Sequence, residues 1–143
     1  MTNLERLYEQ ASRDGIAVEN FPLPQNASIA LEIDGKYYIG IDPKRFDTST
    51  EEAECLAHEI GHCQTKSLYP IGETCRRRYE RRAEVWAITR LIPQKRFLHA
   101  IRQGCREVWE FAEELGTSYA FAEKVVAYYL AKLSNNSAKR SSL

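Results

Sequence analysis

The alternation of apolar and polar positions predicts one helix, then a short sheet, then a series of helices. Residues 2–14 place apolar side chains on one helical face, and Gly15 ends that pattern. The stretch 16–24 holds two prolines and is expected to be extended. Two β-branched and aromatic runs, IALEI and KYYIGI, then flank Asp34-Gly35. Such runs around a D-G pair predict an antiparallel hairpin.

A second amphipathic helix is predicted to begin near Thr48, where Ser and Thr residues precede Glu51 and Glu52 as a capping box. Its apolar positions recur every three or four residues and share one face: Ala53, Leu56, Ile60 and Cys63. His58 and His62 fall nearly opposite this apolar stripe. The pattern therefore predicts that both imidazoles are solvated or line a cleft.

The remaining pattern predicts a loop and four more helices. Residues 67–75 are punctuated by Pro70 and Gly72, and a helix over 76–92 is stopped by Pro93. One face of this helix carries two acids and two alanines, and the alanines allow close approach to the preceding helix: Glu80, Ala83, Glu84, Ala87 and Leu91. Three helices follow over 94–103, 105–115 and 118–133, with breaks at Gly104 and Gly116. They predict a helix-turn-helix-like segment.

The pentapeptide His58-Glu59-Ile60-Gly61-His62 is an H-E-x-x-H motif within the predicted second helix. Two histidines one turn apart share a face and reach one zinc ion with bonds of about 2.0–2.1 Å. Glu59 lies at the edge of that face and can act as general base on a zinc-activated water. A third ligand is needed, and Glu80 is expected to supply it from the next helix. Glu84, one turn later, is expected to bond the N–H of a ligand histidine.

A structural metal site built from Cys55 or Cys63 with the histidines is the competing interpretation. Cys55 and His62 are seven residues apart, about 10 Å along a helix, so both can hardly reach one metal ion. That interpretation also leaves Glu59 without a role. The four cysteines form no C-x-x-C pair and are expected to be reduced thiols. His99, in a later helix, is expected at the surface or partly buried.

Charge and hydropathy restrict the possible partners. Lys and Arg together number 20, as do Asp and Glu, so net charge favours neither nucleic acid nor membrane. The basic run RRRYERR (76–82) spreads around a helix and is expected to be a solvated face. Residues 105–133 carry three basic and five acidic side chains, so DNA binding there is not expected. Neither a signal peptide nor an apolar run of about 18 residues is evident, which predicts a cytoplasmic protein.

The segments HEIGH and YERRAEVWAITRLIP resemble the ImmA/IrrE family of zinc metallopeptidases, in particular its short prophage and mobile-element type. The resemblance implies His58, His62 and Glu80 as zinc ligands and Glu59 as the catalytic acid and base. Where this sequence has Glu84, the family commonly has Asp or Asn, which leaves open which of the two glutamates is the ligand. The family also implies a substrate, a helix-turn-helix repressor encoded nearby. Its cleavage would derepress a mobile element.

The sequence thus predicts an α+β, mostly helical protein with a zincin-like core. A small antiparallel hairpin or sheet precedes the H-E-x-x-H helix, and a three-helix segment ends the chain. A single domain is expected over 1–133, with 94–133 as its tri-helical part and 134–143 as a disordered tail. The predicted function is a zinc-dependent endopeptidase. The alternative is a non-proteolytic regulator, of a toxin–antitoxin kind, that binds a partner through its C-terminal helices.

Overall fold

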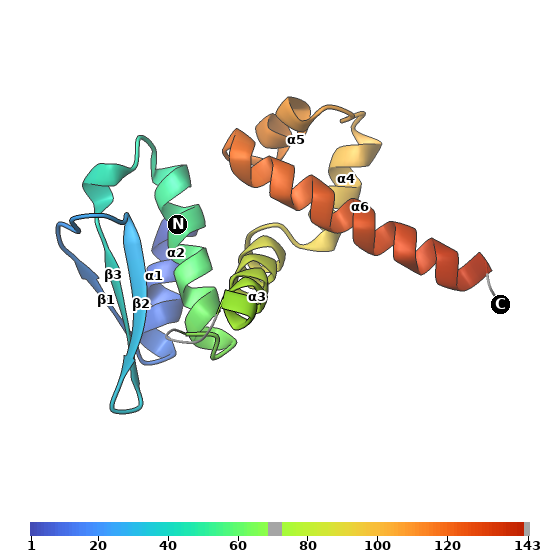
Figure 1. Cartoon of the computed structure of the whole chain (residues 1–143). Helices are drawn as coiled ribbons and strands as arrows, with labels where there is room; N and C mark the ends of the chain where they lie inside the picture. The colour runs from blue at the N-terminus through green and yellow to red at the C-terminus, as the bar shows by residue number, and fades with distance from the viewer. Residues whose placement is uncertain (69–72, 142–143) are drawn as a thin grey trace. The chain divides into compact units, whose positions relative to one another are not determined.

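The computed structural model describes the backbone of residues 1–68 and 73–141 and the side chains of residues 1–68 and 76–136. The chain forms two compact units, Met1–Leu91 and Ile92–Leu143. The first unit contains α1 (Asn3–Arg13), β1 (Ile16–Asn20), β2 (Ser28–Ile33), β3 (Lys36–Ile41), the short 3-10 helix η1 (Pro43–Arg45), α2 (Ser49–Gln64) and α3 (Glu73–Leu91). The second contains α4 (Gln94–Arg102), α5 (Val108–Leu115) and α6 (Tyr119–Ser141). The predicted α+β, mostly helical class is confirmed (Figure 1).

The sheet contains the predicted hairpin and a third strand that the sequence pattern did not assign. β2 and β3 pair antiparallel, and Asp34 and Gly35 in the turn both have positive φ, at 53° and 79°, as a type I′ turn requires. β1 pairs parallel with β3, so the order is β1-β3-β2 and the sheet is mixed rather than purely antiparallel. Periodicity indicates an extended segment but not its partner, which is why this pairing was missed. β2 is left at an edge.

One face of the sheet is covered by α1 and α2, as Figure 1 shows. One residue of each strand, Ile16, Ala30 and Ile39, points into this layer and is buried. The intervening positions of β2, Ile29 and Leu31, point to the other face and are 37% and 43% exposed. Among the described residues of this unit, the helical layer covers one face of the sheet, and α2 packs against β2.

The free edge of β2 presents a defined set of backbone groups. The carbonyl of Ala27 accepts a hydrogen bond from the backbone N–H of Asp42, on the side of β3. In an antiparallel pair, successive residues direct their N–H and C=O groups to opposite sides of the strand. The backbone groups of Ser28, Ala30 and Glu32 consequently point away from β3, to the free edge.

α2 and α3 cross in close contact. α2 begins after Thr48, whose side chain accepts from the N–H of Glu51, and its predicted apolar stripe is buried. A Cβ placed on Gly61 would lie 2.7 Å from the carbonyl oxygen of Ala83, so the predicted close approach at an α3 alanine is confirmed. α3 begins at Glu73, whereas the predicted loop extended to 75. An acid is favourable in the first turn of a helix, and nothing after Gly72 interrupts helical geometry.

The second unit is built around stacked aromatic rings. The Phe97 ring lies 5.2 Å from that of Phe111 and 5.0 Å from that of Tyr129, whose hydroxyl donates to the carbonyl of Ile92. The predicted breaks at Gly104 and Gly116 are confirmed, with φ of 101° and 69°.

α6 is longer than the predicted 118–133 and ends at Ser141. The disorder assigned to 134–143 and the single domain over 1–133 stay predictions. Over the described residues, every helix is too short or too polar to cross a bilayer.

Candidate metal centre

α2 and α3 bring three of the predicted side chains together. The rings of His58 and His62 meet edge to face, with centroids 4.9 Å apart. His58 Nε2 lies 2.9 Å from Glu80 Oε2, and His62 Nε2 lies 3.0 Å from Glu80 Oε1. The ligand atoms of these three residues lie within 4.8 Å of one another. The carboxylate that faces both imidazoles is thus that of Glu80, from the second helix.

The donor set fits a divalent transition-metal ion. Two ligands of a tetrahedral zinc ion lie roughly 3.4 Å apart, close to the spacings of this group. His62 Nδ1 lies 2.6 Å from the carbonyl oxygen of Ser67 and donates to it, which leaves the lone pair of Nε2 for a metal. The side chain of His62 is 4% exposed and that of Glu80 is 44% exposed. The site is therefore enclosed on the α2 side and open at Glu80, as an exchangeable position requires.

Glu84 was predicted to orient a ligand imidazole. Its carboxylate accepts a hydrogen bond of 3.1 Å from Arg81. For His62 the orienting acceptor is the backbone of Ser67, because the chain reverses at Lys66, which has φ of 53°, and returns beneath the ring. A contact between Glu84 and the other imidazole, His58, stays a prediction.

Glu59 is buried beside these ligands, at 9% exposure. Its Oε1 accepts a hydrogen bond of 2.9 Å from the hydroxyl of Ser28, at the start of β2. Burial raises the pKa of the Glu59 carboxyl above its ordinary value, while the Ser28 hydrogen bond and the two imidazoles act to lower it and Glu80 adds to the rise. A carboxylate with a raised pKa is a better proton acceptor than a solvated one.

A cleft of about 410 Å³ opens beside Glu59, His62 and Glu80. Its walls come from β2 and the residues before it, from α2 and from α3, and they comprise Asn26, Ser28, Ile29, Ala30, Glu59, His62, Leu68, Arg76 and Glu80. The edge strand therefore runs beside the imidazole and carboxylates that face the cleft. This arrangement suits a ligand that is extended and lies along β2.

The basic run 76–82 behaves largely as predicted, since all five of its arginines are exposed. Arg76 is the arginine of the run that lines the cleft. Tyr79, within the same run, carries the guanidinium of Arg82 over its ring at 5.6 Å. Arg76 is thus the arginine of the run that is placed to meet a ligand in the cleft.

The cysteines do not support the competing structural site. Cys55, Cys63 and Cys105 are not joined in disulfides, and within the described side chains the metal-ligating group contains no cysteine. Burial, with a smaller contribution from Glu59, raises the pKa of the Cys63 thiol to about 12, so it stays protonated. Cys55 instead lies 2.9 Å from the Ser28 hydroxyl.

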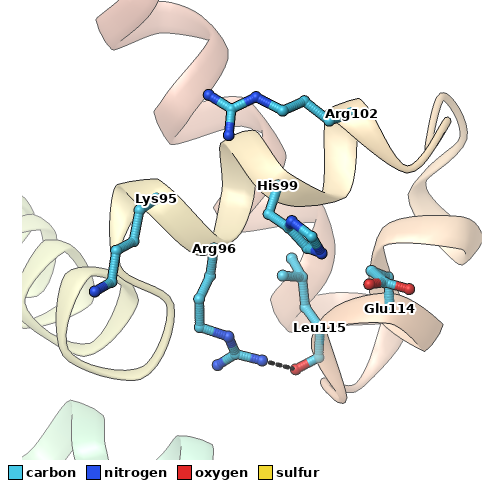
Figure 2. A pocket seen from close by; sticks show the side chains of 6 residues that line it. All are labelled: Lys95, Arg96, His99, Arg102, Glu114 and Leu115. Atoms are coloured by element: carbon cyan, nitrogen blue, oxygen red, sulfur yellow. Dashed lines mark hydrogen bonds between the residues drawn. The ribbon is translucent and has the colours of Figure 1, made fainter.

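A second hollow, of about 320 Å³, lies in the other unit and holds His99 (Figure 2). Arg96 donates to the carbonyl of Leu115 there, at 3.1 Å. Figure 2 shows the side chains of Lys95 and Arg102 pointing away from this contact. The basic groups therefore do not converge on one ligand position, and His99 is exposed, in agreement with its expected surface position.

The sequence pattern did not predict two residues that hydrogen-bond to the side chains of the site. Ser28 precedes the apolar run that marks β2, and its contact with Glu59 depends on how β2 packs against α2. The Ser67 acceptor is a backbone atom, which no side-chain pattern reports. The only available signal was position, because Ser28 immediately precedes the IALEI run that predicts a strand.

Two histidines one turn apart that meet a glutamate of the following helix, beside a buried glutamate, form the site of a metallopeptidase. The profile of the M78 peptidase family, described as the IrrE N-terminal-like domain, matches residues 11–126. The chain belongs to this metallopeptidase family, and the resemblance to ImmA/IrrE proteins is confirmed. No curated protein matches the chain.

Proposed function

We propose that this protein is a cytoplasmic zinc-dependent endopeptidase that cleaves a helix-turn-helix repressor and so derepresses a prophage or mobile element. The observation that carries the proposal is the convergence of His58, His62 and Glu80 next to the buried Glu59, at one wall of an open cleft. Family membership supports the peptidase class. The repressor substrate rests on the resemblance described above.

Each side chain of the site has a defined task in this proposal. His58, His62 and Glu80 hold the zinc ion, which when bound supplies Lewis-acid polarisation of the scissile carbonyl and a water of lowered pKa. Glu59 accepts the proton of the attacking water on its carboxylate and passes it to the nitrogen of the leaving amine. Its raised pKa favours the first of these transfers, the uptake of the proton.

The substrate segment is expected to bind as an additional strand. The free edge of β2 offers the N–H and C=O groups of Ser28, Ala30 and Glu32, and an extended peptide can pair with them. An α-helical segment uses its own backbone groups internally and cannot pair in this way. The scissile bond is therefore expected in an extended linker of the repressor rather than within its helices.

A second candidate function is non-proteolytic binding of a partner through the C-terminal unit. Trp109, Tyr119 and Leu130 of that unit are 55%, 56% and 50% exposed, and exposed large apolar side chains often mark protein contacts. In this case derepression would follow from binding alone.

The deciding experiment incubates the zinc-loaded protein with the repressor encoded beside it and detects fragments by mass spectrometry. We expect cleavage by the wild type and by Glu9→Gln, a control at an exposed position of α1. Glu59→Gln is expected to retain zinc and to give no fragments. Equal relief of repression by Glu59→Gln and by the wild type would instead establish the binding function.

A further inference from the structure

Ser28 lies between two side chains of α2 at the boundary between sheet and helix. Cys55 and Glu59 are four residues apart and therefore share one face of α2. The Ser28 hydroxyl is 2.9 Å from Cys55 Sγ and 2.9 Å from Glu59 Oε1. One hydroxyl thus contacts both side chains.

The number of available protons fixes the direction of these hydrogen bonds. A serine hydroxyl has a single proton, and an ionised carboxylate can only accept. When Glu59 is ionised, Ser28 must donate to it, and the Cys55 thiol must then donate to the Ser28 oxygen. The result is a chain of donors that runs from thiol to hydroxyl to carboxylate.

This chain of hydrogen-bond donors contacts only one carboxylate oxygen of Glu59. Within the described part of the protein, Oε1 accepts from Ser28 and Oε2 has no hydrogen-bonding side chain or backbone group. Glu59 also lines the cleft. A glutamate has three side-chain torsions and loses rotamer entropy when it is fixed, so a carboxylate that must act in one orientation benefits from such a restraint.

We propose that Ser28, supported by Cys55, is a positioning residue that fixes the Glu59 carboxylate with Oε2 turned toward the reacting water. This inference rests on the proposed peptidase function. It assigns Ser28 two separate contributions, because its backbone groups belong to the free edge of β2 while its hydroxyl holds Glu59. A substitution of the side chain therefore removes the restraint and leaves the edge intact.

A purely structural role would give a different result. If the contact only joined β2 to α2, its loss would lower stability and leave the turnover of the folded protein unchanged. A positioning role predicts that kcat falls while KM, zinc content and melting temperature change little.

The test compares Ser28→Ala, Ser28→Thr, Cys55→Ala and Cys55→Ser, with Ser12→Ala as a matched control on the exposed surface of α1. With the repressor as substrate, Ser28→Ala is expected to lower kcat about 10- to 100-fold and to keep KM within about twofold. Ser28→Thr retains the hydroxyl and is expected to recover most of kcat. Cys55→Ser keeps a hydrogen-bond donor and should have a higher kcat than Cys55→Ala. An unchanged kcat in Ser28→Ala, or no recovery in Ser28→Thr, would overturn the proposal.

Two further measurements keep the test decisive. If Ser28→Ala does not fold, the comparison of Cys55→Ala with Cys55→Ser decides, and equal kcat in those two would reject the donor chain. If the zinc-loaded wild type cleaves no repressor, the proposed function fails, and crystal structures of zinc-loaded wild type and Ser28→Ala still test the positioning. We expect one Glu59 orientation in the wild type and several in Ser28→Ala. A wild-type Glu59 that does not bond Ser28 would refute the inference.

Discussion

The crossing of α2 and α3 at Gly61 makes the metal centre sensitive to a single added methyl group. The substitution Gly61→Ala places a Cβ 2.7 Å from the carbonyl oxygen of Ala83 and 3.1 Å from its Cα. The first distance is about 0.7 Å shorter than the 3.4 Å at which ordinary contact begins. Both atoms belong to the α3 backbone, so the clash cannot be relieved by a side-chain rotation, and the helices must separate.

Two opposing terms determine the change in stability. Alanine is favoured over glycine within a helix by about 1 kcal/mol, whereas overpacking of a close contact costs about 1–3 kcal/mol. The free energy of unfolding is therefore expected to fall by about 0–2 kcal/mol. The effect on the metal is larger, because Glu80 lies one turn before Ala83 on α3 and moves with it. Displacement of one ligand is expected to lower zinc affinity about 10-fold or more.

Zinc affinity measured by competition with a chromophoric chelator, together with urea unfolding of the metal-free protein, checks both expectations. Gly61→Val should weaken zinc binding further than Gly61→Ala. Adding Ala83→Gly should not restore it, because the contact is with backbone atoms. If Gly61→Ala bound zinc as tightly as the wild type and gained about 1 kcal/mol from helix propensity, the proposed coupling between helix crossing and metal site would be wrong.

Three other perturbations test separate parts of the structure. The Cys63 thiol has a pKa of about 12 in the folded protein, whereas in the unfolded chain it ionises above about pH 8.5. The free energy of unfolding of the wild type should therefore fall as the pH rises above about 9, by up to about 1.4 kcal/mol per pH unit. In Cys63→Ala, the urea midpoint should depend less on pH. Tyr129→Phe leaves a buried carbonyl unpaired and should cost about 1–3 kcal/mol, against little for the exposed control Tyr119→Phe in the same unfolding assay. Arg76→Ala should raise KM for the repressor several-fold, whereas the exposed control Arg77→Ala should not.

Local sequence patterns account for much of the fold. The D-G turn, the Thr48 cap, the apolar stripe of α2 and the breaks at Gly104 and Gly116 all follow from short-range rules, and each is present. The parallel pairing of β1 depends on tertiary packing, which a period of two does not report. Helix α3 begins earlier than predicted because residues 73–75 permit helical geometry, although they carry no distinct start signal.

The candidate site was predictable where helical spacing determines it. His58 and His62 share a face at a separation of four, and Glu80 approaches both because α2 and α3 cross at Gly61. The residues around the metal ligands were harder to predict from the sequence. Ser28 contacts Glu59 across 31 positions of sequence, and Ser67 acts through its backbone carbonyl. Contacts that depend on register or on backbone atoms leave no periodic signal.

The central claim is that His58, His62 and Glu80 form one zinc centre, and X-ray absorption at the zinc edge tests it most directly. On the wild type and on Glu84→Ala, we expect one zinc per chain, bound through nitrogen and oxygen at about 2.0–2.1 Å. Glu80→Ala should lose most of the metal. A sulfur neighbour at about 2.3 Å, or full zinc retention in Glu80→Ala, would contradict the account and transfer the third ligand to another residue.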